Sequence, residues 1–483
     1  APPMAEPWSM STSTAERPGE ARSAVKAFKA PILGVVLGIV CTLALAGCSE
    51  PLTPDAPDAL PSDDAVSELP STAAVPPDLL KAFRRLLDRR AAALLEGDPG
   101  AFRAGLAKGD PAFVAQQLDY LDNLSRLPLG ELSYDVDRGS LLRQGDDYWV
   151  AVDVALELAG YDSVPVHAPD RYRFSPSRRD PERFVLSSVT DEVWEQRTDV
   201  QPQPWDLGPI EVREGVGVLG IFDQGSLGAA GELMSSVERG ISDVRALVPY
   251  PWDASVVVYA LSDAEFLNTI DDLPGGHPET LDGVSFPVPA APGSAEVAST
   301  RFVLNPRMLG RAGPERDRLV RHELAHVAMA GHDSHAPVWL SEGLAEYVSV
   351  RPLAPEDRRI DQAAIKLAKA GVDALPADST FNDSGSAANY GLSWWACEYV
   401  AVTYGEPALW SLLDYVNVPG SDPGKRMQMA IGLNSRQLAR QGARLLLQTF
   451  APEFLEPTSS PTPSPTPSPT TSPTPTETAS PQG

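Results

Sequence analysis

The sequence is poor in cysteine and in positive charge, and each shortage excludes a class of protein. Its three cysteines, Cys41, Cys48 and Cys397, neither build a disulfide framework nor stand at the spacing of a thiolate zinc site. The apolar surroundings of Cys397 predict a small buried side chain, rather than a reactive thiol, which needs a basic neighbour. Lysine and arginine number 39 against 65 acidic residues, a formal net charge of −26. Because a polyanion would be repelled, we expect no nucleic-acid partner.

The sequence also lacks an apolar run of the ~20 residues that a membrane-spanning helix needs. The apolar run at residues 31–46 has 16 residues, follows three basic residues and ends in small ones, as a secretory signal does. Its end, "LAGC", resembles the bacterial lipoprotein signal. That resemblance implies a signal peptide at residues 1–47, cut before a lipidated Cys48, which anchors the chain to the cell membrane. The alternative is a short anchor helix that stays in place.

Length and composition divide the rest of the chain. Its 483 residues exceed one ordinary core, so we expect two folded domains. Residues 48–76 are rich in proline, aspartate, serine and alanine without periodicity, which predicts a disordered linker. Residues 456–483 are a repetitive proline, serine and threonine tail, also expected to be disordered. The folded domains would then cover residues 77–204 and 205–455.

The first of these domains is predicted to be α+β. Residues 77–97 have helical periodicity between a proline start and a glycine stop, and a second helix is expected at 112–127. Four strand-like runs follow, at 132–137, 147–158, 171–176 and 183–191. Helices followed by an antiparallel meander indicate an α+β unit. It resembles the cone-shaped fold of nuclear-transport-factor-like domains, which hosts both enzymes and passive modules and therefore decides nothing about function.

The second domain is also predicted to mix strands and helices. Strands are expected at 216–222 and 255–261, with an amphipathic helix at 227–248 between them. A long loop rich in glycine and proline covers 272–298 and leads into a short strand at 300–306. The C-terminal part of this domain is predicted to be helical. The whole chain is thus expected to be an α+β protein of two domains.

Four of the six histidines lie between His322 and His335. Residues 315–331 read as a helix with one buried side. Since His322 and His326 are four residues apart, their side chains lie one turn apart on one face, where two imidazoles can bind one Zn²⁺. Glu323 stands beside the first histidine, placed to take a proton from water. This is the H-E-x-x-H arrangement of zinc peptidases, and the alternative is a surface helix with two solvated histidines.

Three residues could complete the site. His332 has the offset of the third histidine in metzincins, H-E-x-x-H-x-x-G-x-x-H, but Met329 stands where that pattern needs its turn glycine. His335 matches no metal-binding motif. The third candidate is Glu342, in the segment "VWLSEGLAEYVSV".

That segment closely resembles the second metal-binding helix of gluzincins, and most of all the peptidase MA-like group. In gluzincins the glutamate of a W-L-x-E-G-x-A pattern is the third ligand, although the spacing from His326 is somewhat shorter here than in the best-known members. The resemblance implies that His322, His326 and Glu342 hold one Zn²⁺ per chain. A fourth position then stays open for water, as a catalytic zinc site requires.

The same resemblance implies roles for other residues. Glu346, one turn after Glu342, has the offset of the acid that hydrogen-bonds the first histidine in gluzincins similar to thermolysin, and such a partner fixes the ring. The alternative is an ordinary exposed glutamate. Tyr390 is the candidate for stabilising the oxyanion, against a packing role. The strand at 300–306 would be the edge strand that pairs with an extended substrate.

The expected function is therefore zinc-dependent hydrolysis of a peptide bond in a peptide or protein substrate, with Glu323 as general base. The enzyme would act outside the cytoplasm, tethered to a bacterial membrane through lipid on Cys48. No feature indicates its oligomeric state. Two other functions stay open: a non-catalytic binding or scaffold lipoprotein in which residues 77–204 do the work, and a zinc amidase of the cell wall.

Overall fold

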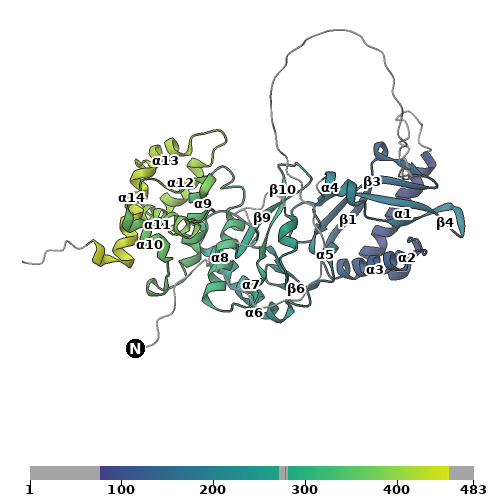
Figure 1. Ribbon diagram of the computed structural model, residues 1–483, viewed down its shortest axis with the longest axis horizontal. Coiled ribbons are helices and arrows are strands. Elements are labelled where there is room, and N and C mark those ends of the chain that lie inside the picture. Colours follow the sequence, from purple (N-terminus) through teal and green to yellow (C-terminus); the bar gives the residue numbers. More distant parts are fainter. Residues whose placement is uncertain (1–76, 199, 271–277, 279–280, 456–483) are drawn as a thin grey trace, which may run out of the picture. The chain divides into compact units, whose positions relative to one another are not determined.

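The computed structural model in Figure 1 describes residues 77–198, 200–270, 278 and 281–455. It contains both helices and sheets, which confirms the predicted α+β class. The predicted signal peptide, the predicted lipidation at Cys48, the predicted linker and the predicted tail all fall on residues outside the described ones. Within the described part, no helix combines the length and the apolar character needed to cross a membrane.

Contacts divide the described chain into two compact units. The sheet unit holds residues 77–331 and 348–352, and the helical unit holds 332–347 and 353–455. Helix α9 (Val338–Val350) begins in the helical unit and ends in the sheet unit. The boundary predicted after residue 204 falls inside the sheet unit, and the two-domain division stays a prediction.

The first part of the sheet unit is an antiparallel sheet packed against helices. Its strands are β1 (Leu129–Val136), β2 (Leu142–Gln144), β3 (Asp147–Leu158), β4 (Val166–Ser177) and β5 (Asp180–Ser188). The order is β1-β3-β4-β5, with β2 on β3, and every pairing is antiparallel. This arrangement confirms the predicted meander.

Three helices precede this sheet: α1 (Pro77–Leu95), α2 (Pro99–Ala104) and α3 (Pro111–Ser125). The sequence predicted α1 and α3 but missed the six-residue α2. Asp98 and Asp110 cap α2 and α3, because each carboxylate accepts two backbone N–H groups of the first turn. Phe83 of α1 is fully buried and stacks on Phe174 of β4, with ring centroids 4.1 Å apart, which holds α1 against the sheet (Figure 1).

The second sheet of this unit carries the candidate site. Its strands are β6 (Glu211–Gly215), β7 (Val218–Phe222), β8 (Val256–Ala260), β9 (Gly283–Pro289) and β10 (Val297–Leu304). Their order is β6-β7-β8-β10-β9, in which β7, β8 and β10 are parallel and the outer two strands antiparallel. Every residue of β7 and β8 is buried, as expected for parallel strands covered on both faces. The crossover helix α6 (Ala230–Leu247) joins them and was predicted.

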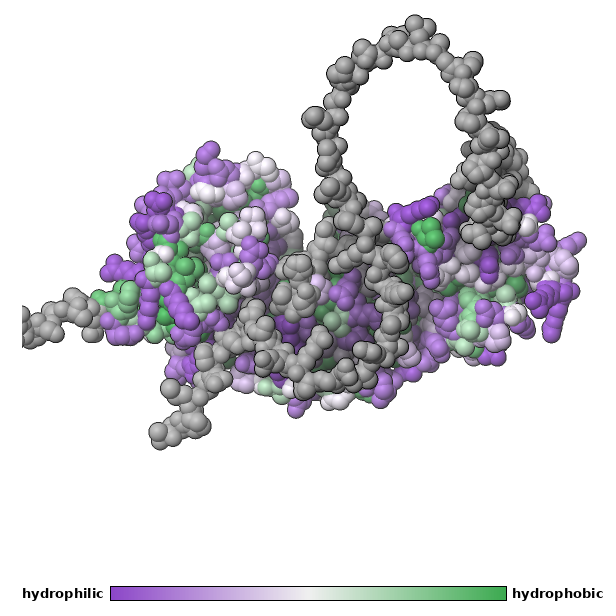
Figure 2. Space-filling model, in the orientation of Figure 1, coloured by the Kyte–Doolittle hydropathy of each residue, from purple (hydrophilic) through white to green (hydrophobic). Residues whose placement is uncertain are grey.

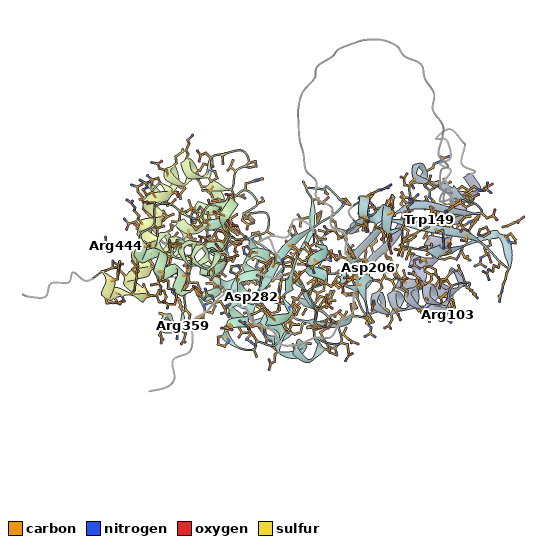
Figure 3. All side chains as sticks on the ribbon, viewed as in Figure 1. Arg103, Trp149, Asp206, Asp282, Arg359 and Arg444 are labelled. Carbon is orange, nitrogen blue, oxygen red and sulfur yellow. The ribbon has the colours of Figure 1, made fainter. Side chains whose placement is uncertain are left out.

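The prediction that residues 300–306 form the edge strand is wrong. They belong largely to β10, which lies between β8 and β9, and the edge strands of this sheet are β6 and β9. The segment 272–298 reads as a loop because Pro287 and Pro289 interrupt it, yet proline is tolerated in an edge strand, where its missing N–H is not needed. Asp282, the residue before β9 (Figure 3), accepts a 2.6 Å hydrogen bond from Arg307 Nε.

A buried ion pair joins the two sheets. Arg301 of β10 donates to Asp162 over 2.7 Å, and both side chains are almost completely buried. Asp162 also accepts from Ser299, and Arg301 donates to the hydroxyl of Tyr259, so the charges are compensated by hydrogen bonds as a buried pair requires. One apolar cluster runs through both sheets, from Phe83 of α1 to Tyr259 of β8.

The helical unit is built around one central helix. Its helices besides α9 are α10 (Gln362–Ala370), α11 (Ser386–Tyr404), α12 (Glu406–Val416), α13 (Pro423–Ile431) and α14 (Ser435–Phe450). Helix α11 contacts α10, α12 and α14. Cys397 lies on α11 with no exposed surface, and burial raises the pKa of its thiol, which confirms the predicted buried side chain.

The remaining described α-helices belong to the sheet unit. Three of them are short, and the fourth, α8, carries His322 and His326. They are α4 (Glu192–Thr198), α5 (Pro204–Leu207), α7 (Pro306–Leu309) and α8 (Pro314–Met329).

On the face in Figure 2 hydrophilic residues predominate, with apolar residues in small scattered areas. Charged side chains such as Arg103 and Arg444 lie at the surface of α2 and α14 (Figure 3).

Candidate metal centre

Helix α8 carries the two histidines and has a clear start. Pro314 occupies its first position, where the missing N–H costs nothing, and Glu315 and Asp317 place negative charge in the first turn. Val320 and Leu324 are fully buried and face α6. At Gly240 of α6 an added Cβ would lie 2.7 Å from Leu324 Cδ1, so this glycine permits the close packing of α8 against α6.

The two predicted histidine ligands converge on one point. His322 is buried and only 8% exposed, and His326 is half-buried one turn later. Their Nε2 atoms lie 3.3 Å apart. Two ligands at ~2.0–2.1 Å from a tetrahedral Zn²⁺ are separated by about 3.3–3.4 Å. The spacing of these two nitrogens therefore matches the spacing that a shared zinc ion imposes.

Glu342 lies on α9, and a glycine controls how that helix packs. At the next residue, Gly343, an added Cβ would lie 2.6 Å from the carbonyl oxygen of Ser393 and 2.8 Å from Cys397 Sγ. Real Cβ atoms do not approach so closely, so only glycine lets α9 contact α11 at this turn. This contact explains the glycine that follows the glutamate in the sequence motif.

The last turn of α9 is anchored beside the histidines. Arg321, which precedes His322, donates from Nε to the backbone carbonyl of Ser349 over 2.7 Å. This bond satisfies one of the carbonyl groups that a helix C-terminus leaves without an intrahelical partner. The guanidinium of Arg321 also lies 3.6 Å from the carboxylate of Asp243 on α6.

The structure brings the three predicted ligands together. One ligand atom from each of His322, His326 and Glu342 lies within 4.8 Å of the other two. Across the described part of the chain, no other three histidine, cysteine or acidic residues meet this criterion. Two imidazoles and a carboxylate form a donor set that suits Zn²⁺.

The other two histidines considered as ligands are not in this group. His332 Nδ1 lies 4.0 Å from a carboxylate oxygen of Asp414, and the backbone N–H of His335 donates to Asn417 over 2.6 Å. Helix α8 continues through Met329 before the chain turns at Gly331. The turn that would direct a third histidine back to the site, as in metzincins, is therefore missing.

Glu323 is 4% exposed and contacts β9. The hydroxyl of Ser285 donates to Glu323 Oε2 over 2.7 Å and contacts the Glu323 backbone carbonyl oxygen at 3.0 Å. At Gly283 an added Cβ would lie 3.2 Å from Glu323 Oε1, so β9 passes close to the carboxylate. Sequence analysis missed both contacts, because β9 lies in a segment that reads as a loop and a lone serine carries no signal.

The roles implied for Glu346 and Tyr390 stay predictions. Glu346 is half-buried and lies one turn after Glu342 on α9. Tyr390 lies in the second turn of α11, and its ring packs edge-on against Phe381 with centroids 5.0 Å apart. The hydroxyl of Tyr390 lies 3.5 Å from the side-chain oxygen of Asn382. These contacts of Tyr390 are those of a packing residue. Stabilisation of the oxyanion by its hydroxyl stays a prediction.

Comparison with models of known protein families and with curated proteins found no match.

Proposed function

We propose that this chain is a zinc-dependent metallopeptidase of the gluzincin type, with His322, His326 and Glu342 as zinc ligands. The observation that carries the proposal is the 3.3 Å separation of the two Nε2 atoms, with a carboxylate oxygen of Glu342 in the same group. Three protein ligands of this kind leave one zinc position for water, as catalytic zinc sites do, whereas structural sites are closed by four.

When bound, zinc acts as a Lewis acid that polarises a carbonyl oxygen and lowers the pKa of water from ~15.7 toward ~7. Glu323 is placed to accept a proton from the attacking water, because it neighbours His322 on α8. As the C–N bond of the substrate breaks, Glu323 passes that proton to the leaving amine. The hydrogen bond from Ser285 holds the carboxylate of Glu323 in one orientation for both transfers.

The free edge of β9 is the surface that we propose for the substrate. Within the described residues, β9 pairs with β10 on one side and has no strand partner on the other. An extended peptide can add to such an edge through backbone hydrogen bonds. Ser285 lies in β9 and contacts Glu323, so a peptide on this edge would pass close to the proposed general base. β9 thus takes the role predicted for residues 300–306.

Replacing Ser285 by alanine is expected to lower kcat about tenfold with little change in KM. The reason is that one hydrogen bond to a charged group contributes roughly 1.5–3 kcal/mol, and this bond orients the base rather than the substrate. Ser285→Thr keeps the hydroxyl and should restore most of the activity. Steady-state kinetics of both variants provide the measurement. Equal losses in the two variants would indicate that Ser285 matters only for packing.

The proposed function is tested by metal analysis and chelation of the purified full chain. We expect about one equivalent of zinc and cleavage of an unstructured protein such as casein. Incubation with a zinc chelator should abolish the cleavage, and added Zn²⁺ should restore it. Crosslinked cell-wall peptides form the second substrate arm. Cleavage of these peptides alone would replace the peptidase assignment by the amidase, and a zinc-free, inactive chain would remove both.

A further inference from the structure

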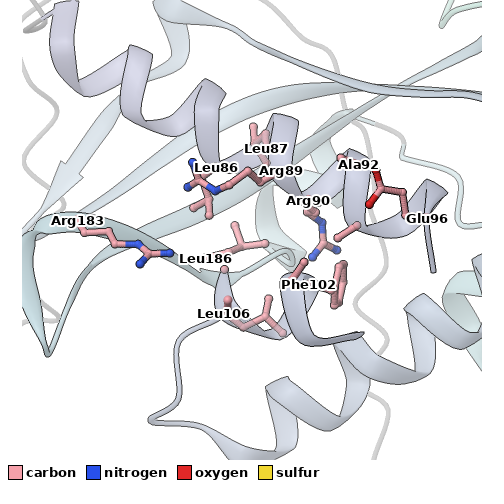
Figure 4. A pocket seen from close by; sticks show the side chains of 14 residues that line it. Leu86, Leu87, Arg89, Arg90, Ala92, Glu96, Phe102, Leu106, Arg183 and Leu186 are labelled. Carbon is pink, nitrogen blue, oxygen red and sulfur yellow. The ribbon is translucent and has the colours of Figure 1, made fainter. Parts of the chain in front are cut away.

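The antiparallel sheet and its helices enclose a cavity that takes no part in the proposed hydrolysis. It has a volume of about 250 Å³ and lies between α1, α2 and β5 (Figure 4). Its lining is mainly apolar, with the side chains of Leu86, Leu106, Leu186 and Phe102 among it. Ligand pockets commonly measure ~300–1,000 Å³, so this cavity suits a small molecule.

One charged side chain in the lining is buried. Arg90 of α1 is only 6% exposed, and its guanidinium lies over the ring of Phe102 at 4.5 Å (Figure 4). Its Nη2 donates to Gln117 over 2.6 Å, and its Nε donates to the hydroxyl of Tyr134 over 3.3 Å. Both acceptors are neutral, and no described carboxylate forms an ion pair with Arg90. A positive charge is therefore held inside the protein without a counter-charge.

The remaining guanidinium nitrogen of Arg90, Nη1, has no acceptor among the described residues. Arg90 Nη1 is buried and forms no hydrogen bond with any described residue. A buried N–H group that lacks an acceptor is costly, and proteins rarely keep one without a reason. The exposed part of the lining adds to the positive potential, because it contains Arg89 and Arg183 against one acid, Glu96. This local excess stands out in a chain whose net charge is −26.

From this geometry we propose that the cavity binds a small carboxylic acid with a short apolar chain. The carboxylate of the ligand would accept from Arg90 Nη1, since arginine is the side chain best suited to a carboxylate. The apolar chain would lie against the leucines and Phe102, where burial of its CH₂ groups is favourable. This site is separate from the metal centre, and the proposal does not depend on the peptidase assignment.

Calorimetric titration of the full chain with hexanoate tests the proposal, with hexan-1-ol as the uncharged comparison. We expect one hexanoate per chain and at least about tenfold weaker binding of hexan-1-ol, because each hydrogen bond to a charged group accounts for about a factor of ten or more in affinity. Arg90→Met, which keeps the length and removes the charge, should weaken hexanoate binding by a similar factor. Arg85→Met is the matched control, since Arg85 is exposed on the same helix, and should bind as the wild type does.

A second variant keeps the test decisive if Arg90→Met does not fold. Ala101 lines the cavity from an exposed position on α2, so Ala101→Trp should block the cavity while leaving Arg90 in place. Hexanoate binding should then be lost although the chain stays folded. The proposal is overturned if the wild type does not bind hexanoate, if hexan-1-ol binds equally well, or if Ala101→Trp leaves hexanoate binding unchanged.

Discussion

Glu323→Gln is expected to abolish peptide hydrolysis and to leave zinc bound. Glutamine has nearly the same shape as glutamate but cannot accept the proton of the attacking water, and a general base contributes about 10²–10⁴-fold to the rate. The metal should stay, because Glu323 is not among the three proposed ligands. The measurements are the zinc content of the purified variant and its kcat/KM on a fluorogenic peptide.

The matched control for this variant is Glu315→Gln, which removes a carboxylate from the first turn of the same helix. Glu315 forms an exposed ion pair with Arg311 at 3.6 Å, and exposed pairs contribute only about 0–1 kcal/mol to stability. This variant should keep both zinc and full activity. Turnover by Glu323→Gln within a few-fold of the wild type would rule out Glu323 as the base.

Glu342→Ala is expected to remove both the zinc and the activity. Even residues that only orient a metal ligand cost about 10–100-fold in affinity when replaced, so loss of a ligand should weaken zinc binding by more than about 100-fold. Since Glu342 is on α9 and the histidines are on α8, two histidines alone would remain. Competition with a chromogenic zinc chelator measures the affinity of the wild type and the variant.

His332→Ala is the control that separates the two possible third ligands. His332 lies beside Asp414, outside the group of three, so its loss should leave zinc binding unchanged. Zinc lost from His332→Ala and retained by Glu342→Ala would reverse the ligand assignment. Zinc retained by both variants would mean that neither residue binds the metal.

The local parts of the site were predictable because they depend on helix geometry alone. A spacing of four residues places His322 and His326 on one face of any α-helix, and the structure shows their nitrogens 3.3 Å apart. The α+β class was equally readable, since apolar periodicity distinguishes helices from strands over ordinary lengths. The identification of Glu342 came from the resemblance of its segment to a known helix, and spacing alone left His332 and His335 open.

The edge strand and Ser285 were not predictable, for a physical reason. β9 is stabilised by its pairing with β10 and by the burial of Val284, Phe286 and Val288, which are interactions between segments that the sequence does not place side by side. Its two prolines favour a loop locally, and only the position at the sheet edge makes them acceptable. The cavity around Arg90 was missed for the same reason, since its lining comes from α1, α2 and β5.

By itself the sequence determined the longer helices, the pairing of the two histidines and the position of Glu323 beside them, because these follow from side chains a few residues apart on one element. Only the tertiary structure decided which strand borders Glu323 and which residue orients it. It also decided how closely α9 approaches α11 at Gly343. Those features depend on packing between distant segments, where the shape of one surface determines what the other can hold.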